Sequence, residues 1–423
     1  MSPSELSSPS RGERYQPRDR LFLWWLGQPS QPVPVGQLDL VRATRGVSLR
    51  YSERWIDQGF ALSEDLPLLP GQEFLPVDRD SAAGAVDDAR PDRWGERVIR
   101  FLDKPSRLSL LEYLYFAGDD RFGALGVSTS EDEYLPRRFG PLPTLADTEV
   151  IAELVRRVLA NEPVAPELKR LISPGVTLGG ARPKALLEIS GEQWVVKFAD
   201  GDPTDSPLME HATLTLAARA DITVADSRAI RLTGGHAVAV RRFDRRGSER
   251  LHALSAKVAL SAAGESYGYP ELAQLLRRRG VVEGERNAEQ MRELFRRMVF
   301  NILIDNTDDH EKNHALLAND AGNYELSPAY DVLPSLQGLG YQQLRVGSDG
   351  ADATLTNALS MCAQFGLKRS AARSEVARVA QVVTGWREHF ASAGVRAGDL
   401  ELIAEHVDRP FLREQREAFA RGA

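Results

Sequence analysis

The feature that most constrains the fold of this chain is a change in the spacing of its apolar residues near residue 250. Between residues 177 and 240 the apolar runs are short and bounded by Gly or Asp, as in residues 185–189 and 194–198, which is typical of strands. Beyond residue 251 apolar side chains recur every three or four positions, and one such helix face comprises Met291, Leu294, Phe295, Met298, Val299 and Ile302. A strand-rich lobe is therefore predicted to precede a helix-rich lobe.

The chain before these lobes adds a third unit. Residues 1–16 lack apolar periodicity and are predicted to be a disordered tail. Residues 17–145 combine strand-like runs with helical patterns, and three prolines mark a connection that ends near residue 145. The predicted order is an N-terminal α+β subdomain (17–145), a strand-rich lobe (146–243) and a helical lobe (244–423).

Composition excludes several classes of protein. The formal net charge of −7 gives no global basic field for direct binding to nucleic acid or anionic membranes. Cys362 is the only cysteine, so an intramolecular disulfide and a thiolate zinc cluster are excluded. The apolar stretch at residues 21–26 is too short to span a bilayer or to act as a signal peptide. A cytoplasmic protein that does not bind membranes is expected.

The most informative segment is NTDDHEKNH, residues 306–314, which directly follows an apolar helix. A solvated turn that caps the helix is the simple interpretation of such a polar cluster. However, Asp308 and Asn313 stand five positions apart, the separation of the base and the metal-binding Asn in a protein-kinase catalytic loop. A further acidic residue, Asp331 in SPAYDV, follows a predicted strand pair, where a kinase places its magnesium-binding Asp.

The residues upstream occur in the order that a kinase requires. The Gly-rich segment GGARPK (179–184) links two predicted strands, Lys197 lies in the apolar strand VVKF, and Glu210 lies early in a predicted helix. Each signal alone has a simpler explanation, namely a hairpin turn, a solvent-facing lysine and a helix N-terminus that favours acidic residues. The ordered set predicts an α+β fold like that of protein kinases, with a strand-rich N-lobe, a helical C-lobe and an appended N-terminal subdomain.

These residue types suit phosphoryl transfer from ATP. A Gly-rich loop lets backbone N–H groups approach phosphate oxygens, and Lys197, oriented by Glu210, would meet the α and β phosphates. Asn313 and Asp331 offer the hard oxygen ligands that Mg²⁺ prefers. Asp308 would orient the acceptor hydroxyl and accept its proton.

Together with RRFDR at residues 241–245, these segments resemble the HipA family of bacterial serine/threonine kinases, the toxins of type II toxin–antitoxin systems. The resemblance extends over most of the chain. It implies that Asp308, rather than Asp309, is catalytic and that Asn313 and Asp331 bind the metal. The nucleotide-binding residues that it implies are Gly179, Gly180, Ala181, Arg182, Pro183, Lys184, Lys197, Glu210, Arg241, Arg242, Phe243, His310, Glu311, Lys312, Asn313 and Asp331.

Two positions depart from the family pattern. Arg241 stands where the best-known members have Glu in the segment between the lobes, and the backbone of residues 241–243 is expected to meet adenine. The family autophosphorylates a Ser before its Gly-rich loop, and Thr177 occupies that position here. Autophosphorylation of Thr177 is therefore a prediction.

The resemblance also implies partners. The expected substrate is a protein, with aminoacyl-tRNA synthetases as the best-studied class, whose phosphorylation inhibits translation and growth. A helix-turn-helix antitoxin is the expected partner, and contact with nucleic acid is expected only through it. Two alternatives remain open: a nucleotide-binding module that docks on an antitoxin–DNA complex without transferring phosphate, and a small-molecule kinase of related fold.

Overall fold

The computed structural model describes residues 15–137, 140–175, 182–319 and 321–420. The N-terminal unit is built on an antiparallel sheet of five strands in the order β4-β3-β2-β1-β5. These strands are β1 (Arg20–Trp25), β2 (Val33–Val41), β3 (Gly46–Tyr51), β4 (Glu73–Phe74) and β5 (Leu125–Ser128). Its helices are α1 (Glu53–Gln58), a 3₁₀ helix (Gly84–Ala89), α2 (Arg93–Val98), a π-helical turn (Ile99–Asp103) and α3 (Leu110–Phe116).

The second unit is an antiparallel sheet of four strands in the order β6-β7-β9-β8. It is preceded by helix α4 (Thr148–Ala160), with short 3₁₀ helices at Leu145–Asp147 and Pro166–Leu171. The strands are β6 (Lys184–Ile189), β7 (Glu192–Lys197), β8 (Ser227–Leu232) and β9 (Gly235–Arg241), and helix α5 (Ser206–Arg219) lies between β7 and β8 in sequence. This arrangement confirms the predicted strand-rich lobe with one intervening helix.

The remaining chain is mostly helical. There are two small sheets in the described part of this unit. One pairs β10 (Arg245–Arg246) with β11 (Glu249–Arg250), and the other comprises β12 (His252–Ser255), β13 (Ala315–Ala318) and β14 (Tyr324–Leu326), the last two of which follow α8 in sequence. The helices are α6 (Ala256–Ala262), α7 (Tyr269–Arg279), α8 (Arg286–Leu303), α9 (Leu355–Ser360), α10 (Arg369–Thr384), α11 (Trp386–Ser392), α12 (Ala397–Val407) and α13 (Pro410–Ala420), with 3₁₀ turns at Glu283–Glu285 and Cys362–Phe365.

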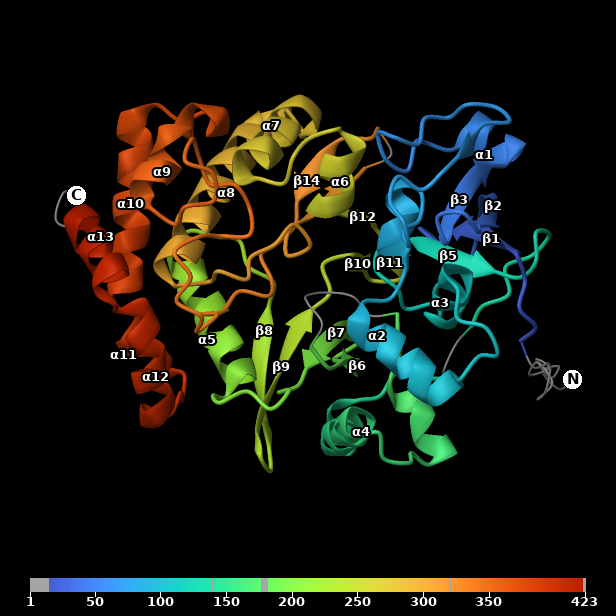
Figure 1. The fold of residues 1–423 in the computed structure, drawn as a ribbon, viewed down its shortest axis with the longest axis horizontal. Helices are drawn as coiled ribbons and strands as arrows, with labels where there is room; N and C mark the ends of the chain where they lie inside the picture. Colours follow the sequence, from blue (N-terminus) through green and yellow to red (C-terminus); the bar gives the residue numbers. More distant parts are fainter. Residues whose placement is uncertain (1–14, 138–139, 176–181, 320, 421–423) are drawn as a thin grey trace, which may run out of the picture.

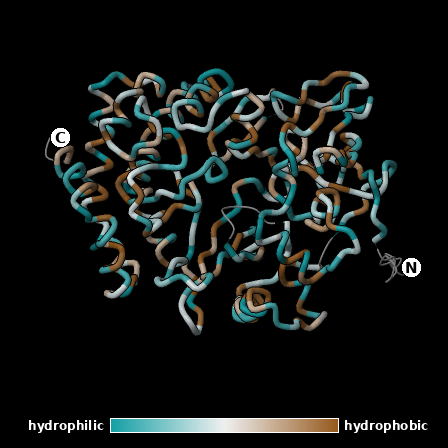
Figure 2. Tube along the Cα trace, viewed as in Figure 1, coloured by the Kyte–Doolittle hydropathy of each residue, from teal (hydrophilic) through white to brown (hydrophobic). Residues whose placement is uncertain are grey.

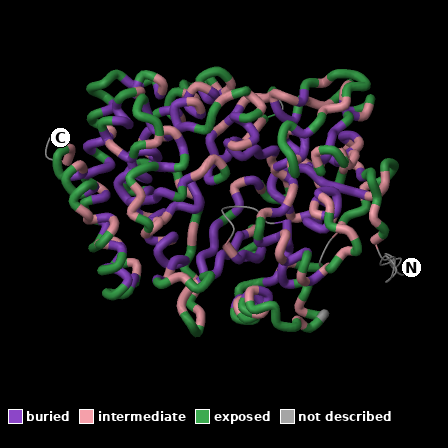
Figure 3. Tube along the Cα trace, viewed as in Figure 1, coloured by how far each residue is buried: buried purple, intermediate pink, exposed green. Residues whose placement is uncertain are grey.

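Figure 1 shows the N-terminal sheet and the C-terminal helices α10–α13 at opposite ends of the molecule, with the four-stranded sheet between them. Buried residues follow the central strands, whereas exposed residues dominate the outer helices (Figure 3). Hydrophilic and hydrophobic residues alternate along those outer helices (Figure 2), as expected for helices that bury one face. Among the residues that the structure describes, no helix combines the length and the apolar character needed to cross a membrane.

Strands β6, β7 and β9 are buried over most of their length, whereas β8 is mostly exposed or half-buried. Successive side chains of a strand point to opposite faces, so the buried strands contribute to cores on both sides of the sheet. On β7, Val195 belongs to the main hydrophobic core together with α5 and the helical lobe, whereas Trp194 and Val196 belong to a second core. Lys197 has the parity of Val195. It therefore points toward α5 and the helical lobe.

The second core contains residues from both sides of the predicted boundary at residue 145. Trp94 and Val98 of α2 pack with α4 and with the outer face of the four-stranded sheet. Trp94 Nε1 also donates a 2.8 Å hydrogen bond to the backbone carbonyl of Lys184 in β6. The hydrophobic cores thus join the N-terminal unit to the strand-rich lobe.

Candidate active site

Three charged side chains from distant parts of the chain meet at one point. Lys197 Nζ lies 2.6 Å from Glu210 Oε1 and 2.6 Å from Asp331 Oδ1. Lys197 and Glu210 are each only 2% exposed, and Asp331 is also buried. The strand lysine, the helix glutamate and the C-lobe aspartate singled out in the sequence therefore form one buried cluster.

Local structure explains why these side chains converge. Lys197 ends β7 on the face that packs toward α5. Glu210 lies in the first half of α5, which begins with Asp205 as its N-cap and Pro207 near its start. Asp331 has a left-handed backbone with φ of 57°, a conformation that Asp tolerates better than most residues.

Charge pairing outweighs burial at Lys197. Burial alone would lower its pKa, but the charges of Asp331 and Glu210 raise the pKa of Lys197 above its usual value. Burial raises the pKa of Glu210, which Lys197 only partly offsets, whereas the charge of Lys197 lowers the pKa of Asp331 despite burial. The ammonium of Lys197 therefore compensates two buried carboxyl groups.

Asp308 and Asp309 point in opposite directions although they are neighbours. Asp308 is exposed, whereas Asp309 is buried. Partial burial raises the pKa of Asp308, and the charge of Asp331 adds to this effect, while His310 and Arg182 oppose it. Asp308 thus carries a solvent-accessible carboxylate whose charge is coupled to the cluster around Lys197.

Asp309 belongs to a buried hydrogen-bond network. Its Oδ2 accepts a hydrogen bond from the hydroxyl of Tyr269. The same oxygen lies 2.8 Å from Nε2 of His314. The charge of His314 and these hydrogen bonds lower the pKa of Asp309 despite its burial. Asn301 extends the network, because its Nδ2 donates to the Tyr269 hydroxyl at 3.2 Å. This network holds the loop from within and leaves Asp308 facing outward.

Asn313 is suited to bind a metal ion. It is buried, and its Nδ2 donates to the backbone carbonyl of Asp308 at 3.3 Å, while its Oδ1 is buried without a hydrogen-bond partner among the described residues. A buried carbonyl oxygen without a partner is costly unless it meets a ligand. Together with the carboxylate of Asp331, Asn313 Oδ1 would give Mg²⁺ two hard oxygen ligands, which leaves positions for phosphate and water.

No group of three or more His, Cys, Asp or Glu within the described part of the chain could hold a metal ion. This finding is compatible with the Asn313 and Asp331 pair, because Mg²⁺ is usually held by one or two protein carboxylates together with substrate phosphates.

The Gly-rich segment is described only in part. Thr177, Gly179, Gly180 and Ala181 lie outside the described residues. Arg182 is held by Asp202, with Nη1 to Oδ2 at 2.8 Å, and by the hydroxyl of Ser206. Pro183 is buried directly before β6, whose backbone pairs with β7.

Lys184 is the register partner of Lys197 on the neighbouring strand. Its buried ammonium pairs with Asp92, which also accepts a 2.9 Å hydrogen bond from Gly95 N at the start of α2. The lysine at the end of the Gly-rich segment is thus anchored to the N-terminal unit.

In the segment between the lobes, residues 241–243, the two arginine side chains form ion pairs within the protein. Arg242 is buried against Asp244, with Nη2 to Oδ2 at 2.7 Å, and donates to backbone carbonyls of Asp120 and Arg121 in the N-terminal unit. Arg241 is exposed and pairs with Glu192 and Asp226. The predicted contact of this segment with adenine would therefore depend on backbone groups and on Phe243.

Phe243 connects this segment to the segment of Asp331. Its ring lies 5.3 Å from that of Tyr330, the residue before Asp331, and 6.2 Å from that of Phe122. The hydroxyl of Tyr330 donates to the backbone carbonyl of Lys312 at 2.8 Å. Phe243, Tyr330 and Lys312 therefore link three of the predicted segments.

The three residues between Asp309 and Asn313 differ in exposure. Lys312 is exposed, while His310 and Glu311 are half-buried. His310 Nδ1 lies 3.2 Å from the backbone N–H of Lys312, and the carbonyl of Glu311 accepts from the N–H of Lys257 at 3.1 Å. The part of these three residues in nucleotide binding stays a prediction.

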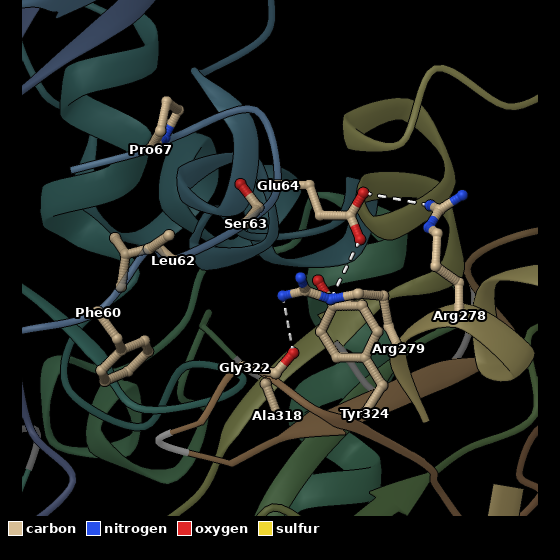
Figure 4. Close-up of a pocket in the computed structure, with 11 residues that line it drawn as sticks. Phe60, Leu62, Ser63, Glu64, Pro67, Arg278, Arg279, Ala318, Gly322 and Tyr324 are labelled. Atoms are coloured by element: carbon tan, nitrogen blue, oxygen red, sulfur yellow. Dashed lines mark hydrogen bonds and ion pairs between the residues drawn. The ribbon is translucent and has the colours of Figure 1, made fainter. Parts of the chain in front are cut away.

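A separate pocket of about 490 Å³ lies between residues 60–67 of the N-terminal unit and the C-lobe. Figure 4 shows Phe60 and Leu62 on one side and Glu64 reaching across to Arg278 and Arg279. Glu64 pairs with both arginines, and none of the predicted site residues lines this pocket, so it is separate from the candidate active site.

Sequence reasoning missed the residues that support the site from elsewhere in the chain. Asp92 and Tyr269 hold Lys184 and the loop of Asp308, yet no motif marks them. His314 ends the segment NTDDHEKNH, but no role was predicted for it. Asp92 carries a recognisable signal only as a helix N-cap, because it directly precedes α2.

Comparison with known families and proteins agrees with the motifs. The family model for the HipA N-terminal domain matches residues 30–128, and that for the HipA-like C-terminal domain matches residues 176–386. "Putative kinase Y4dM" of Sinorhizobium fredii (strain NBRC 101917 / NGR234) is 28% identical over 246 residues, which are 55% of this chain but only 57% of that protein. "Putative kinase Y4mE" of the same strain is 27% identical over 347 residues, 75% of this chain and 77% of that protein.

A solved structure shares the fold. The similar chain belongs to the complex of HipA, HipB and operator DNA from the toxin–antitoxin system of Shewanella oneidensis MR-1, with a TM-score of 0.65 and 17% identity. The similarity covers 95% of this chain and 97% of that chain. The predicted architecture, with a strand-rich lobe, a helical lobe and an N-terminal α+β unit, is therefore confirmed at the level of the fold.

Proposed function

Because this chain belongs to the HipA family, we propose that it is an ATP- and Mg²⁺-dependent kinase that transfers the γ-phosphate to a serine or threonine hydroxyl of a protein. The observation that carries the proposal is the buried cluster of Lys197, Glu210 and Asp331 beside the loop that presents Asp308 and Asn313. Phosphoryl transfer requires this combination of a fixed cation, metal ligands and a carboxylate that faces the acceptor.

Each residue has a distinct part in the proposed reaction. Lys197, oriented by Glu210, would bind the α and β phosphates once ATP is present, and this requires it to exchange its contact with Asp331 for phosphate. Asp331 and Asn313 would then hold Mg²⁺, which neutralises charge on the β and γ phosphates. Asp308 would orient the acceptor hydroxyl and accept its proton, and the carboxylate is exposed to solvent as this step needs.

The acceptor and partners are proposed from the family. A protein such as an aminoacyl-tRNA synthetase is the proposed substrate, whose phosphorylation would inhibit translation and growth. A helix-turn-helix antitoxin is the proposed partner; the Shewanella chain of the same fold was solved with HipB and operator DNA. A cytoplasmic location remains a prediction.

Transfer of labelled phosphate tests the proposal. The protein is incubated with γ-labelled ATP and Mg²⁺, together with either whole-cell protein or a metabolite extract. Label in a protein band at serine or threonine supports the proposal, label in metabolites alone indicates a small-molecule kinase, and ATP binding without transfer indicates a nucleotide-binding module.

We expect Asp331→Ala to weaken Mg·ATP binding by at least about tenfold, because it removes an anionic metal ligand. Lys197 would keep its ion pair with Glu210, so the fold should persist. Calorimetry with Mg²⁺ and with a chelator measures the effect, and Asn313→Ala should show a smaller loss. If the Asp331 variant keeps the full metal dependence of ATP binding, the metal site lies elsewhere.

Autophosphorylation of Thr177 is a further prediction. A phosphate there would add roughly −1.5 to −2 charges beside the Gly-rich segment and repel the phosphates of ATP. Protein incubated with Mg·ATP is expected to gain one phosphate at Thr177 and to lose activity, while Thr177→Ala stays active. Mass spectrometry decides: an unmodified Thr177 beside a phosphorylated external substrate eliminates self-inactivation.

A further inference from the structure

The segment after Asp331 is tied to the start of the loop that carries Asp308. Ser335 makes the connection, because its N–H and its hydroxyl both donate to the backbone carbonyl of Asp305 at 2.9 Å. The Ser335 hydroxyl also contacts that of Thr307. Since Asp305 and Thr307 shortly precede Asp308, the segments of the proposed metal ligand and of the proposed base share one junction.

Arg409 closes the same junction from the C-terminal helices. It lies between α12 and α13, and its Nη2 donates to Asp305 Oδ1 at 2.9 Å and to the backbone carbonyl of Leu339 at 3.0 Å. Its Nη1 donates to the carbonyl of Gly338. One guanidinium therefore joins residue 305, residues 338–339 and the end of the chain.

Burial makes the contact of Arg409 with Asp305 important. Asp305 is 1% exposed and Arg409 is 18% exposed. Burial raises the pKa of Asp305, and the charge of Arg409 is the main opposing influence. The second oxygen, Oδ2, has no hydrogen-bond partner among the described residues and lies 3.9 Å from His406 Nδ1. Without Arg409 the buried carboxylate would be poorly compensated.

The backbone around Arg409 is itself held in place. Asp408 accepts a 3.1 Å hydrogen bond from Trp386 Nε1 and pairs with Arg416, which also donates to the carbonyl of Val407 at 3.1 Å. Leu412, three residues after Arg409 in α13, is fully buried. A rigid turn thus presents Arg409 to the junction.

We propose that Arg409 is a positioning residue for the acceptor side of the site, an inference that rests on the kinase function proposed above. Arg409 bonds Asp305, which shortly precedes Asp308, and also the backbone carbonyls of residues 338 and 339. It thereby sets the position of Asp308 relative to residues 332–340. The ion pairs of Lys197 with Glu210 and Asp331 are complete without it. Loss of Arg409 should therefore slow transfer to the acceptor while ATP binding continues.

The test compares Arg409→Ala and Arg409→Lys in the full chain with Arg413→Ala. Arg413 is a matched control because it lies four residues after Arg409, in α13, has a side chain that is 54% exposed, and lies 4.0 Å from Glu417. For Arg409→Ala we expect kcat for transfer to fall by about tenfold or more, since small misplacements of reacting groups are costly, while the Kd for ATP stays within about twofold. Arg413→Ala should match the wild type.

Two rescue measurements separate positioning from a general loss of structure. Arg409→Lys should recover part of kcat, because lysine restores the charge but cannot bond to all three acceptors in the same geometry. Millimolar guanidinium should increase the kcat of Arg409→Ala and leave the wild type unchanged.

Three outcomes would count against the proposal. If Arg409→Ala transfers phosphate with the kcat of the wild type, this inference alone is overturned. A loss of kcat that is matched by losses in ATP affinity and melting temperature, without rescue, assigns Arg409 a purely structural role and overturns it as well. Absence of transfer by the wild-type protein to any acceptor overturns the kinase proposal itself.

Discussion

Replacing Asp308 with alanine should reduce phosphate transfer by about 10²- to 10⁴-fold, the range expected for loss of a general base. The carboxylate is exposed and makes no side-chain contact that the described fold depends on, so the melting temperature should change little. Since Asp308 acts on the acceptor, ATP affinity should remain near that of the wild type. Initial rates of labelled phosphate transfer, with calorimetry for ATP, measure both quantities.

The control for this variant has to come from the structure. On sequence alone Asp309→Ala is the natural comparison, because Asp309 stands four rather than five positions before Asn313. However, Asp309 is buried and bonded to Tyr269 and His314, so its removal leaves buried polar groups unpaired and should cost about 1–3 kcal/mol of unfolding free energy. Asp349, an exposed carboxylate in the same lobe, is the better control. Transfer by Asp308→Ala at the rate of Asp349→Ala would refute the assignment.

Lys197→Met is expected to produce the largest loss of stability and to prevent ATP binding. The substitution leaves Glu210 and Asp331 buried without their cation, and breaking a buried ion pair typically costs about 3–5 kcal/mol of unfolding free energy. Denaturant unfolding at neutral pH measures this loss. Lys257→Met is the matched control, because its ion pair with Asp87 is longer, at 3.4 Å, and partly exposed.

The loss of stability in Lys197→Met should depend on pH in a defined direction. Burial raises the pKa of Glu210 even in the wild type, and without the ammonium it would raise the pKa of Asp331 as well. A carboxyl group whose pKa is raised on folding favours the folded state at low pH, and this contribution is lost as pH rises through the raised pKa. The deficit relative to the wild type should therefore shrink as pH falls from 7 to about 4. A deficit that is independent of pH would contradict the role assigned to Lys197.

The sequence by itself determined the order of the lobes and most of their elements. Short apolar runs bounded by Gly or Asp predicted β6 and β7, and apolar spacings of three and four predicted α8, because these patterns report which residues a strand or helix buries. The spacing of Asp308 and Asn313, and the position of Asp331 after a predicted strand pair, also marked the segments of the candidate site. These properties are local, so they can be read along the chain.

Only the tertiary structure decided how those segments are held and how far the units are separate. The pairing of Lys184 with Asp92, the packing of Trp94 on the four-stranded sheet, and the contact of Arg409 with Asp305 each join residues about 90 or more positions apart. The opposite orientations of Asp308 and Asp309 likewise depend on Tyr269 and His314. Such contacts form between surfaces that only the folded chain brings together, and no periodicity in the sequence records them.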